Sequence, residues 1–234
     1  MRKYLAISFP GQITMTQHTH RDWNQFTGET VPGTFSLQPV FFENVRRGYS
    51  IVDLGCGAGR VCFDLLRRGY GPLVGIDQNE HCIRFAREKI QNHSGEKTHQ
   101  CRFECSDALH TGFGDGSFDT GIILAVLTTL TTPGERLQIL KEARRIVRRD
   151  GGLYLGEFMQ TWHHPLYYNR YVLGEKETGE MGSFLARDSS GTISFQAHHF
   201  GERELVDLLQ AAGFQITRCM YLPVTTQTGN HING

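Results

Sequence analysis

Three segments in the first half of the chain carry residue types that could bind a ligand. In Val52-Asp-Leu-Gly-Cys-Gly-Ala-Gly-Arg60, three glycines alternate with other residues directly after a short apolar run. Glycine lets the backbone turn sharply and lets a ligand approach without a Cβ atom in the way. Asp77, 22 positions after Gly55, ends a second apolar run and could accept hydrogen bonds from both hydroxyls of a ribose. Asp107 follows a third run and could accept a hydrogen bond from the exocyclic amine of an adenine.

The order of these segments matters, because a single Asp is more often an exposed loop residue or a helix cap than a ligand contact. Three segments at the ends of successive predicted strands, in this order, predict a site for a nucleoside-containing cofactor. The fingerprint of dinucleotide-binding folds has its third glycine at position 60, where this chain has Arg60. Arg60 therefore argues against a nicotinamide-dependent oxidoreductase.

An alternation of apolar runs and amphipathic stretches positions these segments. The predicted strands are Ser50–Leu54, Leu73–Asp77, Cys101–Cys105, Thr120–Leu124, Leu153–Phe158 and Phe214–Leu222. The predicted helices are Val61–Arg68, Glu80–Gln91, a helix from Pro133 to the stop at Asp150-Gly-Gly152, and Glu202–Ala212. Strands that alternate with helices form a parallel sheet covered on both faces, and ligands bind at the carboxyl ends of its strands. The sequence thus predicts the α/β fold class, with a doubly wound, mostly parallel, Rossmann-like sheet.

The helix that begins at Pro133 has the clearest end signals in the chain. Thr132 at the N-cap and Glu135 three residues later predict a capping box, and proline is favoured at the first helical position. The basic residues placed at the C-terminal end of this helix are Arg144, Arg145, Arg148 and Arg149. We expect a solvated basic face that complements the helix dipole, rather than a nucleic-acid site, because the net charge of the chain is zero.

Length and composition restrict the class of protein. A chain of 234 residues predicts one domain whose core needs no disulfide or metal. The 24 Lys and Arg residues balance 24 Asp and Glu residues, which argues against sequence-independent binding of nucleic acid. The six cysteines have no CxxC or zinc-ligand spacing, so we expect buried thiols in a reducing compartment and no metal. Without a signal-peptide pattern or an apolar run near ~18 residues, we expect a cytoplasmic protein with no membrane partner.

We expect the chain to consist of an N-terminal arm or cap, residues 1–47, and a domain, residues 48–234. The arm is polar and irregular. The side chains of the arm that could contact a substrate are His18, His20, Trp23 and Phe26. Within the domain, residues 157–200 join the fifth predicted strand to the last helix and far exceed the usual 2–6-residue connection, so we expect a lid insertion there.

The 157–200 insertion is rich in aromatic and histidine side chains. These are Trp162, His163, His164, Tyr167, Tyr168, Tyr171, His198 and His199. The rings either stack on a substrate or fill a small core of the insertion itself, and a histidine among them could act as a base. Turn residues between Ser183–Asp188 and Thr192–Ala197 predict a hairpin.

From Ser50 to about Leu222 the chain resembles the class I S-adenosylmethionine-dependent methyltransferases, and within them a subgroup of small stand-alone microbial methyltransferase domains. Val52-Asp-Leu-Gly-Cys-Gly-Ala-Gly59 is similar to the glycine motif of that family, Phe118-Asp-Thr-Gly-Ile-Ile-Leu-Ala125 to its fourth-strand motif, and Arg149-Asp-Gly-Gly-Leu-Tyr154 to the turn before its fifth strand. The cofactor implied by the resemblance is S-adenosyl-L-methionine.

The resemblance also implies which residues contact that cofactor. They are Asp53, Gly55, Gly57, Gly59, Asp77, Asp107, Ala108 and Leu124. Asp53 and the glycine turn would hold the methionine end, and Asp77 the ribose hydroxyls. Asp107 and the backbone N–H of Ala108 would bind the adenine, while the backbone at Leu124 or Ala125 would contact the amino group.

The implied function is transfer of a methyl group to an oxygen, nitrogen or sulfur atom of a small-molecule acceptor. The chain lacks the Asn/Asp-Pro-Pro-Tyr/Phe signature and the Pro-Cys pair of base-methylating enzymes, so we expect no DNA partner. A catalytically silent module that binds the cofactor and an RNA methyltransferase remain as alternatives. The acceptor-side candidates are His20, Glu157 and His199. The identity of the acceptor, the use of a general base and the oligomeric state are left open.

The C-terminal end departs from the resembled fold, which has an antiparallel seventh strand between the fifth and sixth. After Phe214–Leu222 the chain offers only the polar, turn-prone Pro223-Val-Thr-Thr-Gln-Thr-Gly-Asn-His-Ile-Asn-Gly234. We therefore expect the seventh strand to be absent or degraded, and a gap or an exposed edge beside the fifth strand.

Overall fold

The structure, a computed structural model, describes residue 27 and residues 35–92, 98–187, 193–225 and 231–232. Its central sheet has five strands in the order β3-β2-β1-β4-β5, and every neighbouring pair is parallel. The strands are β1 (Ile51–Leu54), β2 (Leu73–Asp77), β3 (Cys101–Cys105), β4 (Phe118–Leu124) and β5 (Val147–Gly156). The strand order reverses between β1 and β4, the place where such sheets bind ligands. The predicted α/β, Rossmann-like fold class is confirmed.

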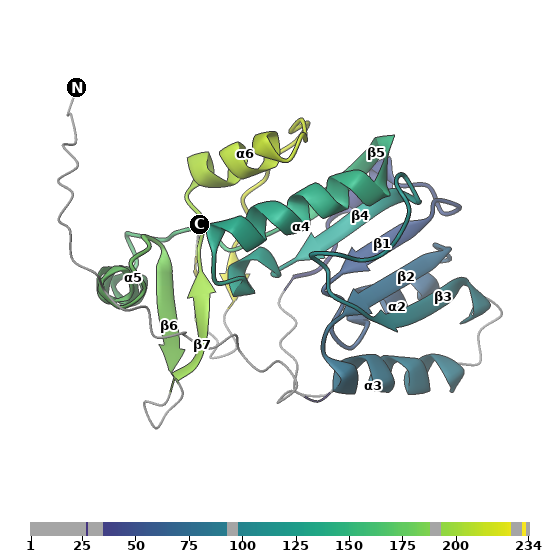
Figure 1. Cartoon of the computed structure of the whole chain (residues 1–234), viewed down its shortest axis with the longest axis horizontal. Coiled ribbons are helices and arrows are strands. Elements are labelled where there is room, and N and C mark those ends of the chain that lie inside the picture. The colour runs from purple at the N-terminus through teal and green to yellow at the C-terminus, as the bar shows by residue number, and fades with distance from the viewer. Residues whose placement is uncertain (1–26, 28–34, 93–97, 188–192, 226–230, 233–234) are drawn as a thin grey trace.

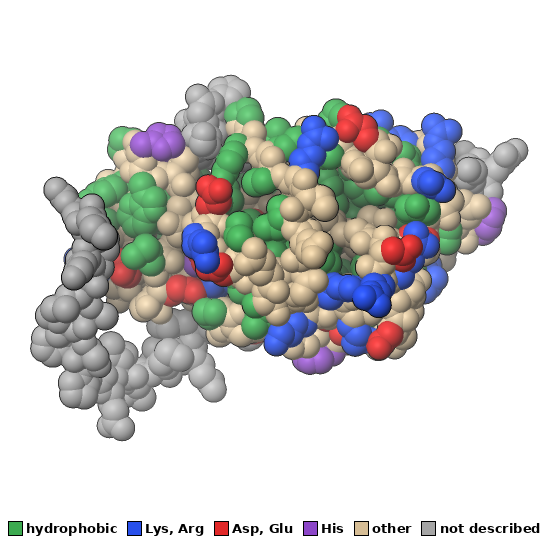
Figure 2. All heavy atoms as spheres, turned by 90° about the horizontal axis from the view of Figure 1, so that it is seen from above, with side chains coloured by type: hydrophobic (Ala, Val, Ile, Leu, Met, Phe, Trp, Pro, Cys, Tyr) green, Lys and Arg blue, Asp and Glu red, His purple; other side chains and the backbone are tan. Residues whose placement is uncertain are grey.

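Helices cover both faces of the sheet. They are α1 (Pro39–Asn44), α2 (Arg60–Arg67), α3 (Glu80–Gln91), α4 (Pro133–Ile146) and α6 (Glu202–Ala211). A further helix, α5 (Pro165–Thr178), packs on β6 in the insertion. Strand side chains alternate between faces, so Ile51 packs with α1, α2 and α3, while Val52 and Leu54 pack with α4 and α6. Figure 1 shows α4 and α6 together on one side of the sheet and α3 on the other. On the face seen in Figure 2, basic and acidic side chains are interspersed.

The helix α4 begins as predicted but ends earlier. The Thr132 hydroxyl accepts the Glu135 N–H, and the Glu135 carboxylate accepts the Thr132 N–H, which completes the capping box. The helix ends at Ile146, and β5 starts at once with Val147 opposite Phe118 of β4. The placement of Arg148 and Arg149 in the last helical turn was therefore wrong, because pairing with β4 takes these residues into a strand.

The 157–200 insertion contains α5 and an antiparallel hairpin of β6 (Ser183–Arg187) and β7 (Ile193–His198), at one end of the molecule in Figure 1. The hairpin was predicted, although its turn lies outside the described residues. The helix α5 was missed, because its apolar residues form no single clear stripe. Its boundary signals are present in the sequence: Pro165 is at the first helical position and Gly179 follows in the left-handed region, with φ 75°.

The C-terminal region differs most from the prediction. Residues 214–222 form no strand, so the sixth strand predicted at Phe214–Leu222 was wrong. Among the described residues, the central sheet ends at β5, which leaves the exposed edge that the sequence predicted. The short strands β8 (Val224–Thr225) and β9 (His231–Ile232) pair only with each other.

Other expectations have mixed outcomes. Phe41 of α1 is 2% exposed and belongs to the core, so the stretch before residue 48 is not wholly irregular. His18, His20, Trp23 and Phe26 lie outside the described residues.

All six cysteines are free and four are buried, but Cys105 and Cys219 are exposed, contrary to the prediction. No helix in the described part of the chain is both long and apolar enough to cross a membrane.

Candidate functional site

The glycine turn links β1 to α2 with a backbone that only glycine adopts without strain. Gly55, Gly57 and Gly59 have φ values of 76°, 52° and 78°. A Cβ atom on Gly55 would lie 2.5 Å from Val126, and one on Gly59 would lie 2.5 Å from the ring of Phe103. Conformation therefore requires glycine at all three positions, and space requires it at Gly55 and Gly59 as well.

Two carboxylates lie beneath and beside this turn. Asp77 at the end of β2 accepts the Gly57 N–H at 2.8 Å and the Asn79 N–H at 2.9 Å, so it ties the turn to β2. Asp53 in β1 is 3% exposed, and the only hydrogen-bond donor it has among the described residues is the Cys62 thiol at 3.7 Å. Burial raises the pKa of Asp53 to about 7 and also raises the pKa of Asp77. Neither forms an ion pair with a described residue, so a cationic ligand would favour both in their ionised form.

The third strand end lies next to the second. Ser106 N–H donates to the Asp77 carbonyl oxygen at 3.1 Å, and Asp107 follows in an exposed turn where its carboxylate accepts the Leu109 N–H at 2.8 Å. The other carboxylate oxygen of Asp107 lies 3.9 Å from the His110 ring. The structure thus brings Asp77, Asp107 and Ala108 to one edge of the sheet, as the sequence predicted.

The fourth strand end is held by a buried carboxyl group. Ala125, directly after Leu124, has φ 55°, which is unusual for a residue with a side chain, and its N–H donates to the Gly156 carbonyl oxygen at 2.8 Å. The Glu157 carboxylate then accepts the N–H groups of residues 126, 127 and 128 at 3.0, 2.8 and 3.2 Å. Burial raises the pKa of Glu157 to about 8, although the three amides favour its ionised form. Glu157 therefore shapes the turn after β4.

A cavity of about 1350 Å³ reaches the carboxyl ends of β4 and β5. Leu124, Gly156 and Glu157 line it, and it extends along the exposed edge of β5 between that strand and residues 213–222. The aromatic residues that line the part of the cavity near the insertion are Phe35, Phe158, Tyr167, Phe184 and Phe195, together with His164 and His199. Cavities that bind small molecules have this apolar, aromatic character.

His199 stands in the aromatic part of this cavity. Its ring stacks on Phe158, with centroids 5.3 Å apart and planes 19° apart, and its Nδ1 lies 2.8 Å from the hydroxyl of the fully buried Tyr171. Burial lowers the pKa of His199 to about 3, so the imidazole is neutral at ordinary pH. Tyr167 and Tyr171 form a small core with Phe184, so these rings fill the core of the insertion, one of the two predicted purposes. Trp162 and Tyr168 are exposed, and stacking on a substrate stays a prediction.

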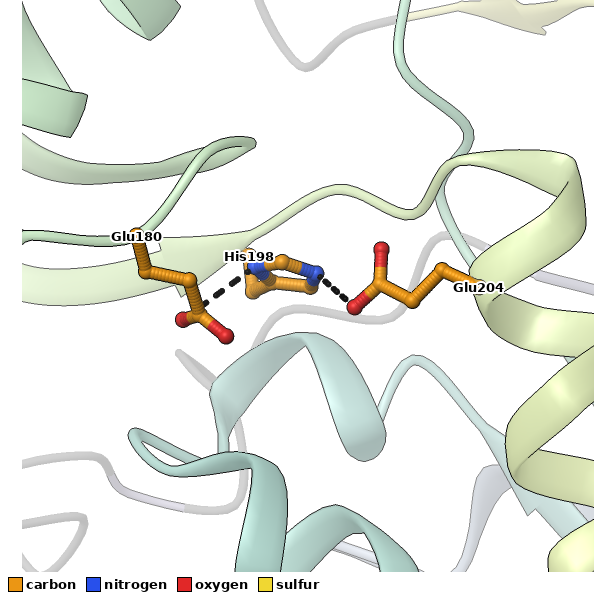
Figure 3. A group of neighbouring side chains, drawn as sticks. All are labelled: Glu180, His198 and Glu204. Carbon is orange, nitrogen blue, oxygen red and sulfur yellow. Dashed lines mark hydrogen bonds and ion pairs between the residues drawn. The ribbon is translucent and has the colours of Figure 1, made fainter. Parts of the chain in front are cut away.

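A second group of polar residues joins the insertion to the sheet. Figure 3 shows the His198 ring between Glu180 and Glu204, with Nε2 at 2.8 Å from the Glu204 carboxylate and Nδ1 at 3.5 Å from that of Glu180. The fully buried Arg136 of α4 donates to both oxygens of Glu180 at 2.6 and 2.8 Å. Ser183 donates to Glu180 at 2.6 Å and lies 2.9 Å from His198 Nδ1.

The ligating atoms of Glu180, His198 and Glu204 lie within 4.8 Å of one another, as in some metal sites. The arrangement suits ion pairing better, because the two carboxylates flank opposite nitrogens of one imidazole and Arg136 already occupies both oxygens of Glu180. This network was not predicted, since an arginine within an amphipathic helix is ordinarily exposed. Nothing in the sequence around Arg136 signals its burial.

The comparisons with known proteins agree with this geometry. A family model described as a methyltransferase domain matches residues 51–151. A solved structure of an S-adenosylmethionine-dependent methyltransferase from Methanosarcina mazei is 37% identical, has a TM-score of 0.79, and is matched over 85% of this chain and 94% of its own. A ubiquinone/menaquinone biosynthesis C-methyltransferase of Roseobacter denitrificans is 30% identical over 73% of this chain and 68% of its own length. The chain belongs to the class I S-adenosylmethionine-dependent methyltransferases.

The methyltransferase also resembles methyltransferase GfsG of Streptomyces halstedii, with 27% identity over half of this chain. The match spans only 40% of the length of that relative. This likeness therefore does not identify the acceptor, which has to be inferred from the cavity.

The residues of this methyltransferase fit S-adenosylmethionine. The cofactor carries a sulfonium and an ammonium cation, and Asp53 and Asp77 are buried carboxylates without a cationic partner among the described residues. A glycine turn that a Cβ atom would obstruct borders the same carboxylates. When bound, the cofactor supplies an activated methyl group, and the protein has to position an acceptor and exclude water.

Proposed function

We propose that this enzyme methylates a small molecule that binds in the cavity beside β5. One observation carries the proposal: the cavity is lined by Leu124 and Gly156, so it opens at the carboxyl ends of β4 and β5. Leu124 is itself a cofactor-site candidate, and β4 pairs with β1, whose carboxyl end leads into the glycine turn. At about 1350 Å³ it exceeds the 300–1,000 Å³ of ordinary ligand sites and leaves room for an acceptor of moderate size.

We further propose the cofactor contacts that the family resemblance implies. Asp53 and the Gly55–Gly59 turn hold the methionine end, Asp77 binds the ribose, and Asp107 with the Ala108 N–H binds the adenine. Their location along the ends of β1, β2 and β3 supports this assignment. The cofactor's amino group is a donor, so the contact at the fourth strand end is a backbone carbonyl oxygen of Leu124 or Ala125; the Ala125 N–H already bonds the Gly156 carbonyl oxygen.

In the transfer, a lone pair of the acceptor forms a bond to the methyl carbon while the carbon–sulfur bond breaks and its electrons stay on sulfur. A base is needed only where the acceptor atom must also lose a proton. The acceptor atom we propose is oxygen, nitrogen or sulfur. Because the relative from Roseobacter denitrificans is named a C-methyltransferase, a carbon acceptor should be tested too. His199, in the cavity wall, is better placed near an acceptor than Glu157, whose oxygens bind three amides.

Two measurements test the proposal. Calorimetric titration with S-adenosylhomocysteine should show binding, and its absence at high micromolar concentration would contradict the assigned cofactor site. A metabolite library should then be screened for release of S-adenosylhomocysteine, with mass spectrometry and NMR of any product to locate the new methyl group. Binding without turnover on any small molecule, or turnover on transfer RNA alone, would contradict the proposed acceptor.

A further inference from the structure

The aromatic part of the cavity contains a cation without a counter-charge. Arg170 of α5 is half-buried and lines the cavity, with its guanidinium carbon 5.3 Å from the ring centre of Tyr167 and 5.5 Å from that of Phe184. No described residue forms a hydrogen bond or ion pair with it. Cation–π contacts over ring faces leave the in-plane N–H donors of a guanidinium free. An anion that enters the cavity would complete this site.

A neutral hydrogen-bond donor lines the same space. The Thr161 N–H donates to the Tyr171 hydroxyl oxygen at 3.3 Å, which leaves the tyrosine proton for His199 Nδ1 at 2.8 Å. The hydrogen of the neutral imidazole is then on Nε2, which has no partner among the described residues. His199 therefore offers an N–H donor to an oxygen acceptor in the cavity.

A further polar atom in this wall is unsatisfied. His164 Nδ1 is buried and makes no hydrogen bond with any described residue, and His164 also lines the cavity. Buried polar atoms without a partner are uncommon and costly, so a polar group of a bound molecule would satisfy His164 Nδ1 as well as Arg170 and His199.

The remaining walls select for a flat molecule. Phe35 and Phe158 have ring centres 4.7 Å apart, and Tyr167 and Phe184 complete the apolar surface around His199. Aromatic rings prefer to bind other rings by offset stacking or edge-to-face contact. The combination of a cation, a neutral N–H donor and aromatic walls is specific for an aromatic acid.

Resting on the proposed function above, we propose that the acceptor is an aromatic acid, a planar ring with a carboxylate or phenolate oxygen bound by Arg170 and His199. The anionic oxygen is the anchor of the acceptor, and the ring lies between the aromatic walls. Arg170 and His199 thus determine which acceptor binds, while the proposed cofactor contacts lie at the carboxyl ends of strands in the central sheet.

Ligand-observed NMR with matched probes tests this. The probes are 4-hydroxybenzoate and its methyl ester, 4-nitrophenol ionised at alkaline pH and 4-nitroanisole, and cyclohexanecarboxylate as a non-aromatic acid. Each is titrated into the full chain with and without S-adenosylhomocysteine. We expect each aromatic acid to bind at least tenfold more tightly than its neutral partner and than cyclohexanecarboxylate. The carboxylate and phenolate series distinguish the two sources of negative charge.

Variants locate the anchor. Arg170→Gln should weaken binding of the aromatic acids at least tenfold, and Arg170→Lys should restore part of it. Arg149→Gln, which removes an exposed arginine at the far end of the same cavity, should change nothing, and all three should bind S-adenosylhomocysteine like the wild type. Equal binding of acids and esters, no binding of any acid, or equal effects of Arg170→Gln and Arg149→Gln would each overturn the proposal. Failure of S-adenosylhomocysteine to bind would instead overturn the proposed function.

Discussion

At the scale of single residues, the glycine turn offers a comparison between two positions with the same backbone. Gly55 and Gly112 have φ values of 76° and 75°, but a Cβ atom on Gly55 would lie 2.5 Å from Val126, whereas one on Gly112 meets nothing within 4 Å. Gly112→Ala should lose roughly 1–2 kcal/mol of stability, since alanine is strained at positive φ. Gly55→Ala should lose more, because its Cβ atom also has to displace Val126. Only Gly55→Ala should also lose affinity for S-adenosylhomocysteine, at least tenfold by calorimetry. Equal affinities of the two variants for S-adenosylhomocysteine would show that the glycine turn does not contact the cofactor.

The buried Asp53 predicts how cofactor binding depends on pH. Burial raises the folded-state pKa of this carboxyl to about 7, and a cationic cofactor favours the ionised form, so binding should release a proton. For a group with that pKa, affinity for S-adenosylmethionine should rise about tenfold between pH 6 and pH 8, with little change above. Calorimetry across this range should show the rise in the wild type and in Asp64→Asn, an exposed control, but not in Asp53→Asn. A flat wild-type profile would mean that Asp53 does not sense the cofactor charge.

At the scale of elements, the network around His198 holds the insertion against α4 and α6. Glu180 and Glu177 both carry partly exposed carboxylates and both pair with an arginine, but the partner of Glu180 is the fully buried Arg136 and that of Glu177 is the surface residue Arg187. Glu180→Gln should cost about 3 kcal/mol, because it leaves a guanidinium buried without its carboxylate. Glu177→Gln should cost less than about 1 kcal/mol. Urea unfolding of the two variants measures both losses of unfolding free energy. Similar losses would show that leaving Arg136 buried without the Glu180 carboxylate does not destabilise the protein.

The same network predicts a dependence of stability on pH. Burial lowers the pKa of His198, but the carboxylates of Glu180 and Glu204 outweigh burial, so the pKa is raised. The nearby Arg136 guanidinium also lowers this pKa, and Ser183 is hydrogen-bonded to Nδ1. A histidine with a raised folded pKa contributes its full stability below the unfolded value of about 6.5 and loses it as pH rises through the folded value. The stability difference between the wild type and His198→Gln should therefore be larger at pH 6 than at pH 9. Urea unfolding of both proteins at pH 6 and pH 9 measures this stability difference. A stability difference that grows with pH would show that the His198 imidazole is not charged in the folded protein.

At the scale of the whole molecule, the sequence predicted the half of the fold in which the pattern of apolar residues in a segment agrees with the packing of that segment in the sheet. The strands β2 and β3 and the helix α3 have the predicted boundaries, since the apolar pattern of each segment agrees with the residues that it buries. The cofactor-site candidates Asp77 and Asp107 follow from this, because parallel strands bring their ends to one edge.

The remaining half depends on contacts that no local pattern records. Arg170 lies on a helix whose apolar residues form no stripe, and Arg136 is buried by partners 44 and 68 positions away in the chain. Phe214–Leu222 was predicted as a strand, yet in the described part of the chain it pairs with no strand and lies across the cavity from the edge of β5. A pattern of apolar residues predicts which residues favour an extended backbone, but a strand also needs a partner edge within reach.

The exposed edge of β5 gives the last prediction. Residues 150–157 and residues 213–222 line opposite walls of the same cavity, so the two segments are separated rather than paired. After the Phe214 N–H, which donates to the Leu209 carbonyl oxygen, no amide of residues 215–222 donates to a described backbone group. In hydrogen-exchange mass spectrometry, peptides from 215–222 should exchange almost as fast as an unfolded chain, while peptides from β1 and β4 exchange only on global unfolding. S-adenosylhomocysteine should slow exchange at the glycine turn without protecting 215–222. Protection of 215–222 equal to that of β4 would show that a sixth strand forms in solution and that the cavity is filled by the chain itself.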